Sequence, residues 1–346
     1  MRFESGQAGC LWITGSLDST LHETRAEAIW FSESFPSPLS DEAHPVTLRF
    51  KAHCAVMTSS LLWGVTFVVV KNTLTDMSVF AYLAARFILG ALPMAWVYRS
   101  DLRKLSRGEL WAGFYVGAVM FGGYAFQTAG IARTTPSKAA FITGISVVLV
   151  PVFLAAIWRR RINAWAWAGV FASFAGLYFL TVPRQGIHDL NRGDVMVMGC
   201  AVLYALQIIF ISRYSGKYSL GSMSFLQVAW TAGLSLLAVP LFAATGWEAL
   251  RFRLTSQMVF GVLVTAIFTT AIAYPLLVWA QRHTTATNTA LILATEPVYA
   301  AITSFIVLRE RLGARALVGA GLILTGILVA ELKGPIPASE EIHHDA

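Results

Sequence analysis

The chain has 346 residues, of which 56% are hydrophobic and only 13% are charged. This charged share is about half that of a typical soluble domain, so the composition excludes an ordinary soluble protein and favours a membrane protein. The net charge of +7 comes from lysines and arginines that are scattered singly or in small clusters between apolar runs. This scatter is not the concentrated basic patch of a nucleic-acid-binding protein.

Residues 1–56 differ from the rest because they are polar, mixed in charge and not periodic. They contain no continuous apolar core of signal-peptide length. Two interpretations stay open: a disordered cytoplasmic tail, or a start assigned too far upstream, with Met57 as the true first residue. Residues 333–346 are predicted to form a disordered C-terminal tail.

Ten apolar runs follow, and most are long enough to cross about 30 Å of hydrocarbon as a helix. Inside lipid the backbone must satisfy its own hydrogen bonds, and no long alternating segments suggest a barrel, so a helical bundle is expected. The predicted fold class is therefore an all-α integral membrane protein with ten transmembrane helices. The predicted spans cover residues 55–71, 78–98, 109–131, 138–158, 164–182, 194–213, 223–244, 257–280, 286–308 and 313–332.

The ninth run carries a carboxylate, Glu296, near its middle, directly followed by Pro297. An ionisable group at that depth costs several kcal/mol on insertion scales, and such groups face a protein interior or a watery cavity. The proline removes a backbone donor and loosens the helix beside the carboxylate. Glu296 is therefore a functional-site candidate; the alternative is a structural glutamate bonded to a neighbouring helix.

The sequence also repeats itself at a shift of about 150 residues. No gap is needed from the third run to the tenth, although upstream Trp63 falls on Tyr204 only with a gap. A repeat of five helices is odd in number, so its second copy enters the membrane in the opposite direction, as in many secondary transporters. The matched pairs include Thr134 with Thr284, Tyr124 with Tyr274, Arg159 with Arg309, Gly169 with Gly319 and Gly176 with Gly326.

The loop charges fit inverted halves, because each half has its own excess of lysine and arginine and the two excesses lie on opposite sides. Their sum, and the weight of the first helices, favour a cytoplasmic N terminus. Ten spans then place the C terminus in the cytoplasm as well. The expected location is the cytoplasmic membrane, with multiple passes.

Several motifs, in their order, resemble the drug/metabolite transporter superfamily, EamA-type branch. They are Leu61-Leu-Trp-Gly-Val-Thr-Phe-Val-Val-Val-Lys71, Ala85-Arg-Phe87, Thr134-Thr-Pro-Ser-Lys-Ala-Ala-Phe-Ile-Thr-Gly144 with Val150-Pro-Val152, Glu296-Pro-Val298 and Arg309-Glu-Arg-Leu312. The resemblance implies two inverted five-helix EamA repeats, residues 57–182 and 194–332, and export or exchange of small metabolites. One departure is Arg160, where the first repeat of this family often has an acidic residue.

Arg86 lies near the middle of the second span and needs a counter-charge or several acceptors. It is expected to bind a substrate carboxylate, to pair with Glu296, or to clamp backbone carbonyls. Lys71 closes the first span, where it either lines the pathway or extends to the membrane interface. Asp194, at a span end, is expected to be solvated.

Six aromatic or amide side chains lie well inside spans and together form a plausible cavity lining: Trp63, Tyr124, Gln127, Tyr204, Gln207 and Tyr274. Aromatic rings can stack on a planar substrate, while the amides and hydroxyls bond its polar groups. For each residue the alternative is helix-to-helix hydrogen bonding. Gly144, Pro151 and Pro297 are candidate helix hinges.

These features predict a secondary carrier for a small metabolite or amphipathic compound, with alternating access and with Glu296 as a candidate proton carrier. No Gly-rich phosphate loop is present, so direct use of ATP is not expected. No cofactor or metal site is predicted, and Cys10, Cys54 and Cys200 lack metal-ligand spacing. The expected partners are a small-molecule substrate, lipid and protons, with the protein a monomer or homodimer. Two alternatives are a receptor or scaffold and an intramembrane enzyme.

Overall fold

The computed structural model describes residues 45–134, 136–182, 191–308 and 313–333, all within a compact unit of residues 36–346. In these ranges the regular structure is helical, and the only β pairing is an isolated bridge between Met77 and Phe252. Most of the two predicted tails, and the turn at 309–312, lie outside the described residues.

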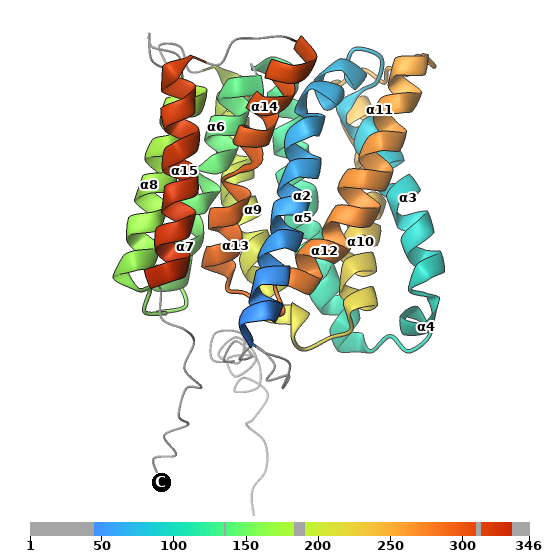
Figure 1. Ribbon diagram of the computed structural model, residues 1–346. Coiled ribbons are helices and arrows are strands. Elements are labelled where there is room, and N and C mark those ends of the chain that lie inside the picture. Colours follow the sequence, from blue (N-terminus) through green and yellow to red (C-terminus); the bar gives the residue numbers. More distant parts are fainter. Residues whose placement is uncertain (1–44, 135, 183–190, 309–312, 334–346) are drawn as a thin grey trace, which may run out of the picture. The chain divides into compact units, whose positions relative to one another are not determined.

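The helices lie along the apolar runs that were predicted as spans (Figure 1). The first five correspond to α2 (Pro45–Thr73), α3 (Val79–Val97), α5 (Arg107–Arg133), α6 (Pro136–Gly144) with α7 (Ser146–Ala156), and α8 (Ala164–Thr181), with a short α4 (Arg99–Leu102) after α3. The others are α9 (Arg192–Ser215), α10 (Leu220–Ala244), α11 (Ser256–Ala266) with η1 (Ile267–Ile272) and α12 (Ala273–Ala280), α13 (Ala286–Leu293) with α14 (Glu296–Leu308), and α15 (Ala314–Lys333).

The first helix is longer than expected. α2 begins at Pro45, and both Ala52 and Val56 are completely buried in the core. Residues 45–56 are therefore helical rather than part of a tail, so the expected boundary at residue 56 is wrong in position. The sequence missed these turns because Arg49, Lys51 and His53 interrupt the apolar pattern.

Seven helices in the described ranges are long and apolar enough to cross a membrane. Their outward faces carry large apolar side chains, for example Leu92, Trp96, Leu237 and Phe260, each at least 60% exposed. A soluble protein rarely exposes so much contiguous apolar surface, whereas lipid accommodates it. The chain is thus an all-α, multi-pass membrane protein.

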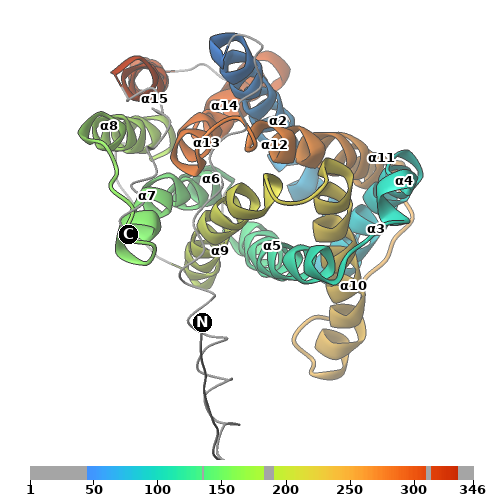
Figure 2. The ribbon, with the colours of Figure 1, turned by 90° about the horizontal axis from the view of Figure 1, so that it is seen from below.

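The helix packing is reciprocal between the halves. In the first half, α2 packs against α12 and α14 of the second half. Its equivalent in the second half is α9, which packs against α5, α6 and α7 of the first half. The last helix of each half pairs with the other, so α8 lies beside α15 in both views (Figures 1 and 2). That pair is close: an added Cβ on Gly319 would lie 2.6 Å from the Gly176 carbonyl oxygen, and one on Gly326 equally close to that of Gly169.

Two predicted spans are interrupted at equivalent positions. α6 ends at Gly144 and α7 begins at Ser146, while α13 ends at Leu293 and α14 begins at Glu296. Pro297 has no N–H for the carbonyl four residues earlier, and its ring crowds that carbonyl, which favours an interruption of the helix there. A shift of 150 places Ser146 on Glu296. The other hinge candidate, Pro151, lies inside α7 without ending it.

A third interruption is η1, one π-helical stretch between α11 and α12. A π-turn widens the helix by one residue and is frequent at functional sites. Here Thr269 and Thr270, adjacent in sequence, are both fully buried. Adjacent residues of a regular helix point about 100° apart, so the π-turn helps both hydroxyls reach one partner.

Candidate functional site

A cavity lies between the two halves and contains about 940 Å³ of empty space, including its open mouth. Eight of the nine predicted binding or coupling residues line it, and only Lys71 does not. Two of the three hinge candidates, Gly144 and Pro297, line it as well, whereas Pro151 does not. The remaining wall includes the polar residues Thr66, Thr128, Thr143 and Ser146 and several apolar side chains, among them Phe67, Val70, Ile131, Val147, Ile208, Leu277 and Leu293.

Glu296 is the first residue of α14 and borders the cavity at the helix break. The partial positive charge at a helix N-terminus attracts a carboxylate there. The neighbouring helix α2 comes close at Gly64, where an added Cβ would collide with the backbone carbonyl of Glu296. Among the residues that the structure describes, no hydrogen bond or ion pair reaches the Glu296 carboxylate. The carboxylate is therefore available to a ligand or a proton.

Arg86, on α3, is only 4% exposed and is held by hydroxyl groups. Its Nε donates to Thr270 Oγ1 at 3.1 Å, and its Nη2 donates to Thr269 Oγ1 at 2.8 Å and to the Tyr124 hydroxyl at 3.2 Å. The guanidinium also lies over the Tyr124 ring, 4.6 Å from its centroid. The expected pairing with Glu296 is not present, and neither are bonds to backbone carbonyls within the described ranges.

The four aromatic candidates form one cluster. The Tyr274 hydroxyl donates to the Tyr124 hydroxyl at 2.8 Å, and these two residues are 150 positions apart. Trp63 packs on Tyr274 with ring centroids 5.4 Å apart, and Tyr204 packs on Tyr124 at 5.5 Å. The repeat shift exchanges one contact for the other, because Trp63 falls on Tyr204. Each half therefore contributes two equivalent rings, and each ring contact joins the two halves around the central tyrosine pair.

The two amides occupy different situations. Gln127 accepts from the Tyr204 hydroxyl at 2.9 Å and donates to Thr143 Oγ1 at 3.5 Å, so its role includes fixing the cavity wall. Gln207 is 5% exposed, and its Nε2 has no acceptor in the described part of the chain. Burying an amide without a hydrogen-bond partner carries an uncompensated desolvation penalty. Gln207 can therefore donate a hydrogen bond to a ligand in the cavity.

Lys71 serves the end of another helix. Its ammonium donates to the carbonyl oxygens of Ile131, which lines the cavity, and of Thr134, the latter at 3.1 Å. These carbonyls lie at the C-terminal end of α5, where a cation is favourable. Lys71 thus neither lines the cavity nor simply extends to the interface.

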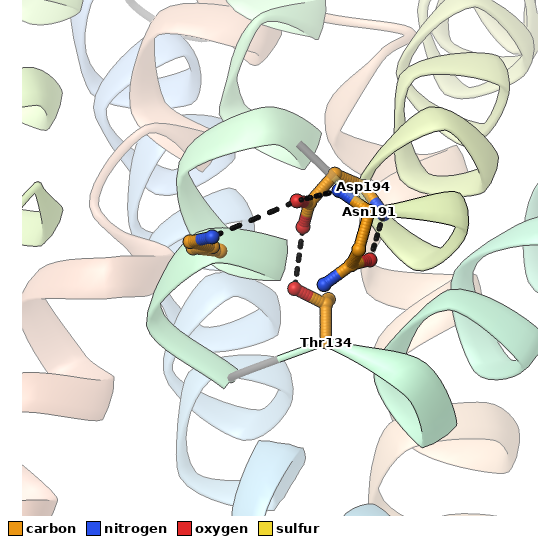
Figure 3. A network of polar contacts seen from close by, with 4 residues as sticks. Thr134, Asn191 and Asp194 are labelled. Carbon is orange, nitrogen blue, oxygen red and sulfur yellow. Dashed lines mark hydrogen bonds and ion pairs between the residues drawn. The ribbon is translucent and has the colours of Figure 1, made fainter. Parts of the chain in front are cut away.

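Asp194 corrects the expectation of a solvated residue, because it is completely buried (Figure 3). It accepts from Thr134 Oγ1 and lies 3.7 Å from the Lys138 ammonium. With Asn191 it forms a capping box at the start of α9: the Asn191 N–H donates to Asp194 Oδ2 at 2.9 Å, and the Asp194 N–H donates to Asn191 Oδ1 at 3.0 Å. The network joins the ends of α5, α6 and α9 outside the cavity.

Comparison with protein-family models decides the family. The model described as the EamA-like transporter family matches residues 50–182 and again residues 191–332. The chain belongs to the EamA-like transporter family. It is therefore a membrane transporter of the drug/metabolite type, as its motifs indicated, and its family is one of transporters rather than enzymes.

Relatives of this EamA transporter include proteins that are described as transporters. An uncharacterized transporter of Archaeoglobus fulgidus is 32% identical over 285 residues, covering 82% of this chain and 87% of the relative. The uncharacterized transporter YvbV of Bacillus subtilis is 23% identical, covering 79% and 89%. A WAT1-related chloroplastic protein of Arabidopsis thaliana is 26% identical, covering 77% and 66%. A crystal structure shares the fold with a TM-score of 0.67 at 19% identity, covering 82% and 96%.

Two residues of this EamA transporter's site escaped the sequence reasoning: Thr269 and Thr270, which hold Arg86. A threonine pair inside an apolar run is a weak signal, because threonine hydroxyls also bond the carbonyl four residues earlier in the same helix. Thr269 does bond the Thr265 carbonyl in that way, at 2.7 Å. No sequence pattern predicts a π-turn, so the contact of both Thr269 and Thr270 with Arg86 was not predictable.

Proposed function

We propose that this EamA transporter is a secondary carrier that exports a small metabolite or amphipathic compound across the cytoplasmic membrane by alternating access. The observation that carries the proposal is the Glu296 carboxylate, which lies at the wall of a cavity between the halves and has no partner among the described residues. Secondary transporters bind their substrates at such places, where interrupted helices meet near the midplane.

The proposed architecture is ten transmembrane helices in two inverted five-helix repeats, residues 57–182 and 194–332. The reciprocal helix contacts support it, and so does the hydrogen bond between Tyr124 and Tyr274, whose positions correspond. A contact between two corresponding residues is expected where a pseudo-two-fold axis passes between them. An even number of spans places both termini on the same side, which we take to be the cytoplasm.

The chemistry of the cavity indicates what it accepts. Glu296 can hold a cationic group or a proton, and the Gln207 amide at the cavity wall can donate to a polar group. The rings of Trp63, Tyr204 and Tyr274 provide flat apolar faces for a planar or amphipathic body. A carboxylate inside a membrane protein can gain and lose a proton only if a proton or a substrate can reach it. The cavity gives Glu296 that access, so we propose that Glu296 also carries a coupling proton.

A receptor or scaffold is the alternative from another class. It requires no polar cavity, and a solid, dry interface between the halves would favour it. The lining of this cavity by polar side chains from both halves favours transport instead.

The test is comparative extracellular metabolomics on cells that overproduce the wild type, Glu296→Gln or no transporter, at matched membrane levels. A matched control is Glu109→Gln, because Glu109 lies outside the cavity in a capping box with Ser106 that glutamine can maintain. We expect a small set of compounds to accumulate outside with the wild type and Glu109→Gln but not with Glu296→Gln. Equal accumulation with Glu296→Gln would remove that residue from the mechanism.

A further inference from the structure

The cavity is not symmetric with respect to the two repeats. Around the tyrosine pair, both members of several matched pairs line it: the shift that places Trp63 on Tyr204 also places Thr66 on Gln207, and all four are wall residues. Farther out, the wall continues only toward the ends of α2 and α5. There Val70 lines the cavity, as do the three α5 and α6 residues Thr128, Ile131 and Ala140.

The partners of these outer residues do not line the cavity. Ile131 corresponds to Gln281 and Val70 to Ile211, and neither partner belongs to the wall. Gln281 is 3% exposed and Ile211 is completely buried. The cavity therefore extends toward the end of the molecule where α2 and α5 end, and it is closed toward the opposite end, where α9 and α12 end.

A second observation concerns the Gln281 side chain itself, and Arg282, Arg213 and Ser215 near the same end also carry a buried polar atom without a partner among the described residues. Both polar atoms of the Gln281 side chain are buried, and neither has a hydrogen-bond partner within the described residues. An amide that is buried without partners is unfavourable compared with a hydrated one, and such groups in native structures call for an explanation. Gln281 directly follows the last residue of α12, about two helical turns beyond Tyr274 toward the closed end.

A contact links two segments at this closed end. Just after Gln281, the Arg282 Nη2 donates to the Tyr218 carbonyl at 2.6 Å, which fastens the end of α12 to the connection between α9 and α10. At the other end the corresponding segments are fastened by Lys71, on α2, to the carbonyls of α5. The two ends are thus held by contacts of the same kind, a cation on a carbonyl, made from different residues.

We infer that Gln281 is a wall residue of the pathway at the opposite face: when the halves exchange their conformations, Gln281 takes the place that Ile131 has here, and its amide contacts water and the polar part of the substrate. The inference rests on the proposed function, because only alternating access between inverted repeats makes the two conformations equivalent. It adds a binding group to the transport path, and it explains why a buried glutamine lacks partners in this conformation.

Thiol labelling tests the inference without knowledge of the substrate. In a background where Cys10, Cys54 and Cys200 are replaced by serine, single variants Ile131→Cys and Gln281→Cys are reacted with a membrane-impermeant maleimide. Vesicles of both orientations are used. We expect Ile131→Cys to react from one face and Gln281→Cys from the other, each about ten-fold faster than from the wrong face, since labelling follows the population of the open state. Ile211→Cys serves as the second variant and should follow Gln281→Cys.

The inference is overturned if Gln281→Cys and Ile211→Cys react from the same face as Ile131→Cys, or if neither reacts while Ile131→Cys does. In either case export that persists in the metabolomic experiment would leave the proposed function intact. If Ile131→Cys is also unreactive from both faces and no compound is exported, the proposed function fails together with the inference. Adding Arg282→Met should raise the labelling rate of Gln281→Cys, because it removes the contact of Arg282 with the Tyr218 carbonyl.

Discussion

The outer helix pair and the central cavity are made from the same two repeats, yet they use the repeat relation differently. Where α8 meets α15, corresponding positions carry the same residue: Gly169 matches Gly319, and Gly176 matches Gly326. At the cavity wall the corresponding residues differ in chemistry, as with Ser146 and Glu296. Close packing of two backbones needs the same small residue on both sides, whereas a pocket for an asymmetric molecule needs different groups on its walls.

Replacing Arg86 should have the largest effect on stability, because this residue holds several side chains beside the cavity. Arg86→Met leaves the buried hydroxyls of Thr269, Thr270 and Tyr124 without their common donor. Hydrogen bonds to a charged group contribute about 1.5–3 kcal/mol each. Removing the buried charge recovers part of this loss, so we expect a net loss of stability on the order of 3 kcal/mol. Thermal unfolding in detergent measures it, and Arg86→Lys should lie between Arg86→Met and the wild type. A variant Arg86→Met as stable as the wild type would contradict the clamp.

The helix pair should be disturbed less. In Gly319→Ala the added Cβ would lie 2.5 Å from the Leu180 nitrogen and 2.6 Å from the Gly176 carbonyl oxygen, so the helices must separate. Overpacking of this kind costs about 1–3 kcal/mol. The matched control is Gly321→Ala on the same helix, where an added Cβ meets nothing within 4 Å. The packing role of Gly319 is contradicted if both variants unfold at the same temperature. It is also contradicted if Gly319→Ala leaves the unfolding temperature unchanged but alters the labelling rate of Ile131→Cys at the cavity.

The smallest loss of stability is expected for the tyrosine pair, which joins corresponding positions of the two repeats at the cavity wall. Tyr124 accepts from both Arg86 and Tyr274, whereas the Tyr274 hydroxyl donates to Tyr124 and has no contact with Arg86 among the hydrogen bonds of the described residues. Tyr124→Phe should therefore cost more than Tyr274→Phe, although both changes should stay within about 0.6–1.7 kcal/mol. Unfolding of the two single variants and the double variant gives the coupling between the hydroxyls. Equal losses for both single variants would mean that Arg86 gains nothing from Tyr124.

The candidate site was predictable in its members but not in its contacts. Polar residues deep in apolar runs identified Glu296 and Arg86, because such residues are rarely placed in lipid. Their separation could not be foreseen: each has its own surroundings, and the π-turn that supplies Thr269 and Thr270 to Arg86 leaves no mark in the sequence. Lys71 and Asp194 were misjudged for a similar reason. Both lie at span ends, where solvent is the usual partner, yet here the ends of other helices cover them.

The sequence by itself determined the membrane character, the family and the repeat. Each depends on local runs of residues or on motif order, which survive without knowledge of the packing. The tertiary structure alone decided which residues meet: that Tyr124 touches Tyr274, that Arg86 and Glu296 stay apart, and that one end of the cavity is open to Ile131 while the other buries Gln281. These outcomes follow from helix packing between segments more than a hundred positions apart, and no local pattern encodes the distance between two such helices.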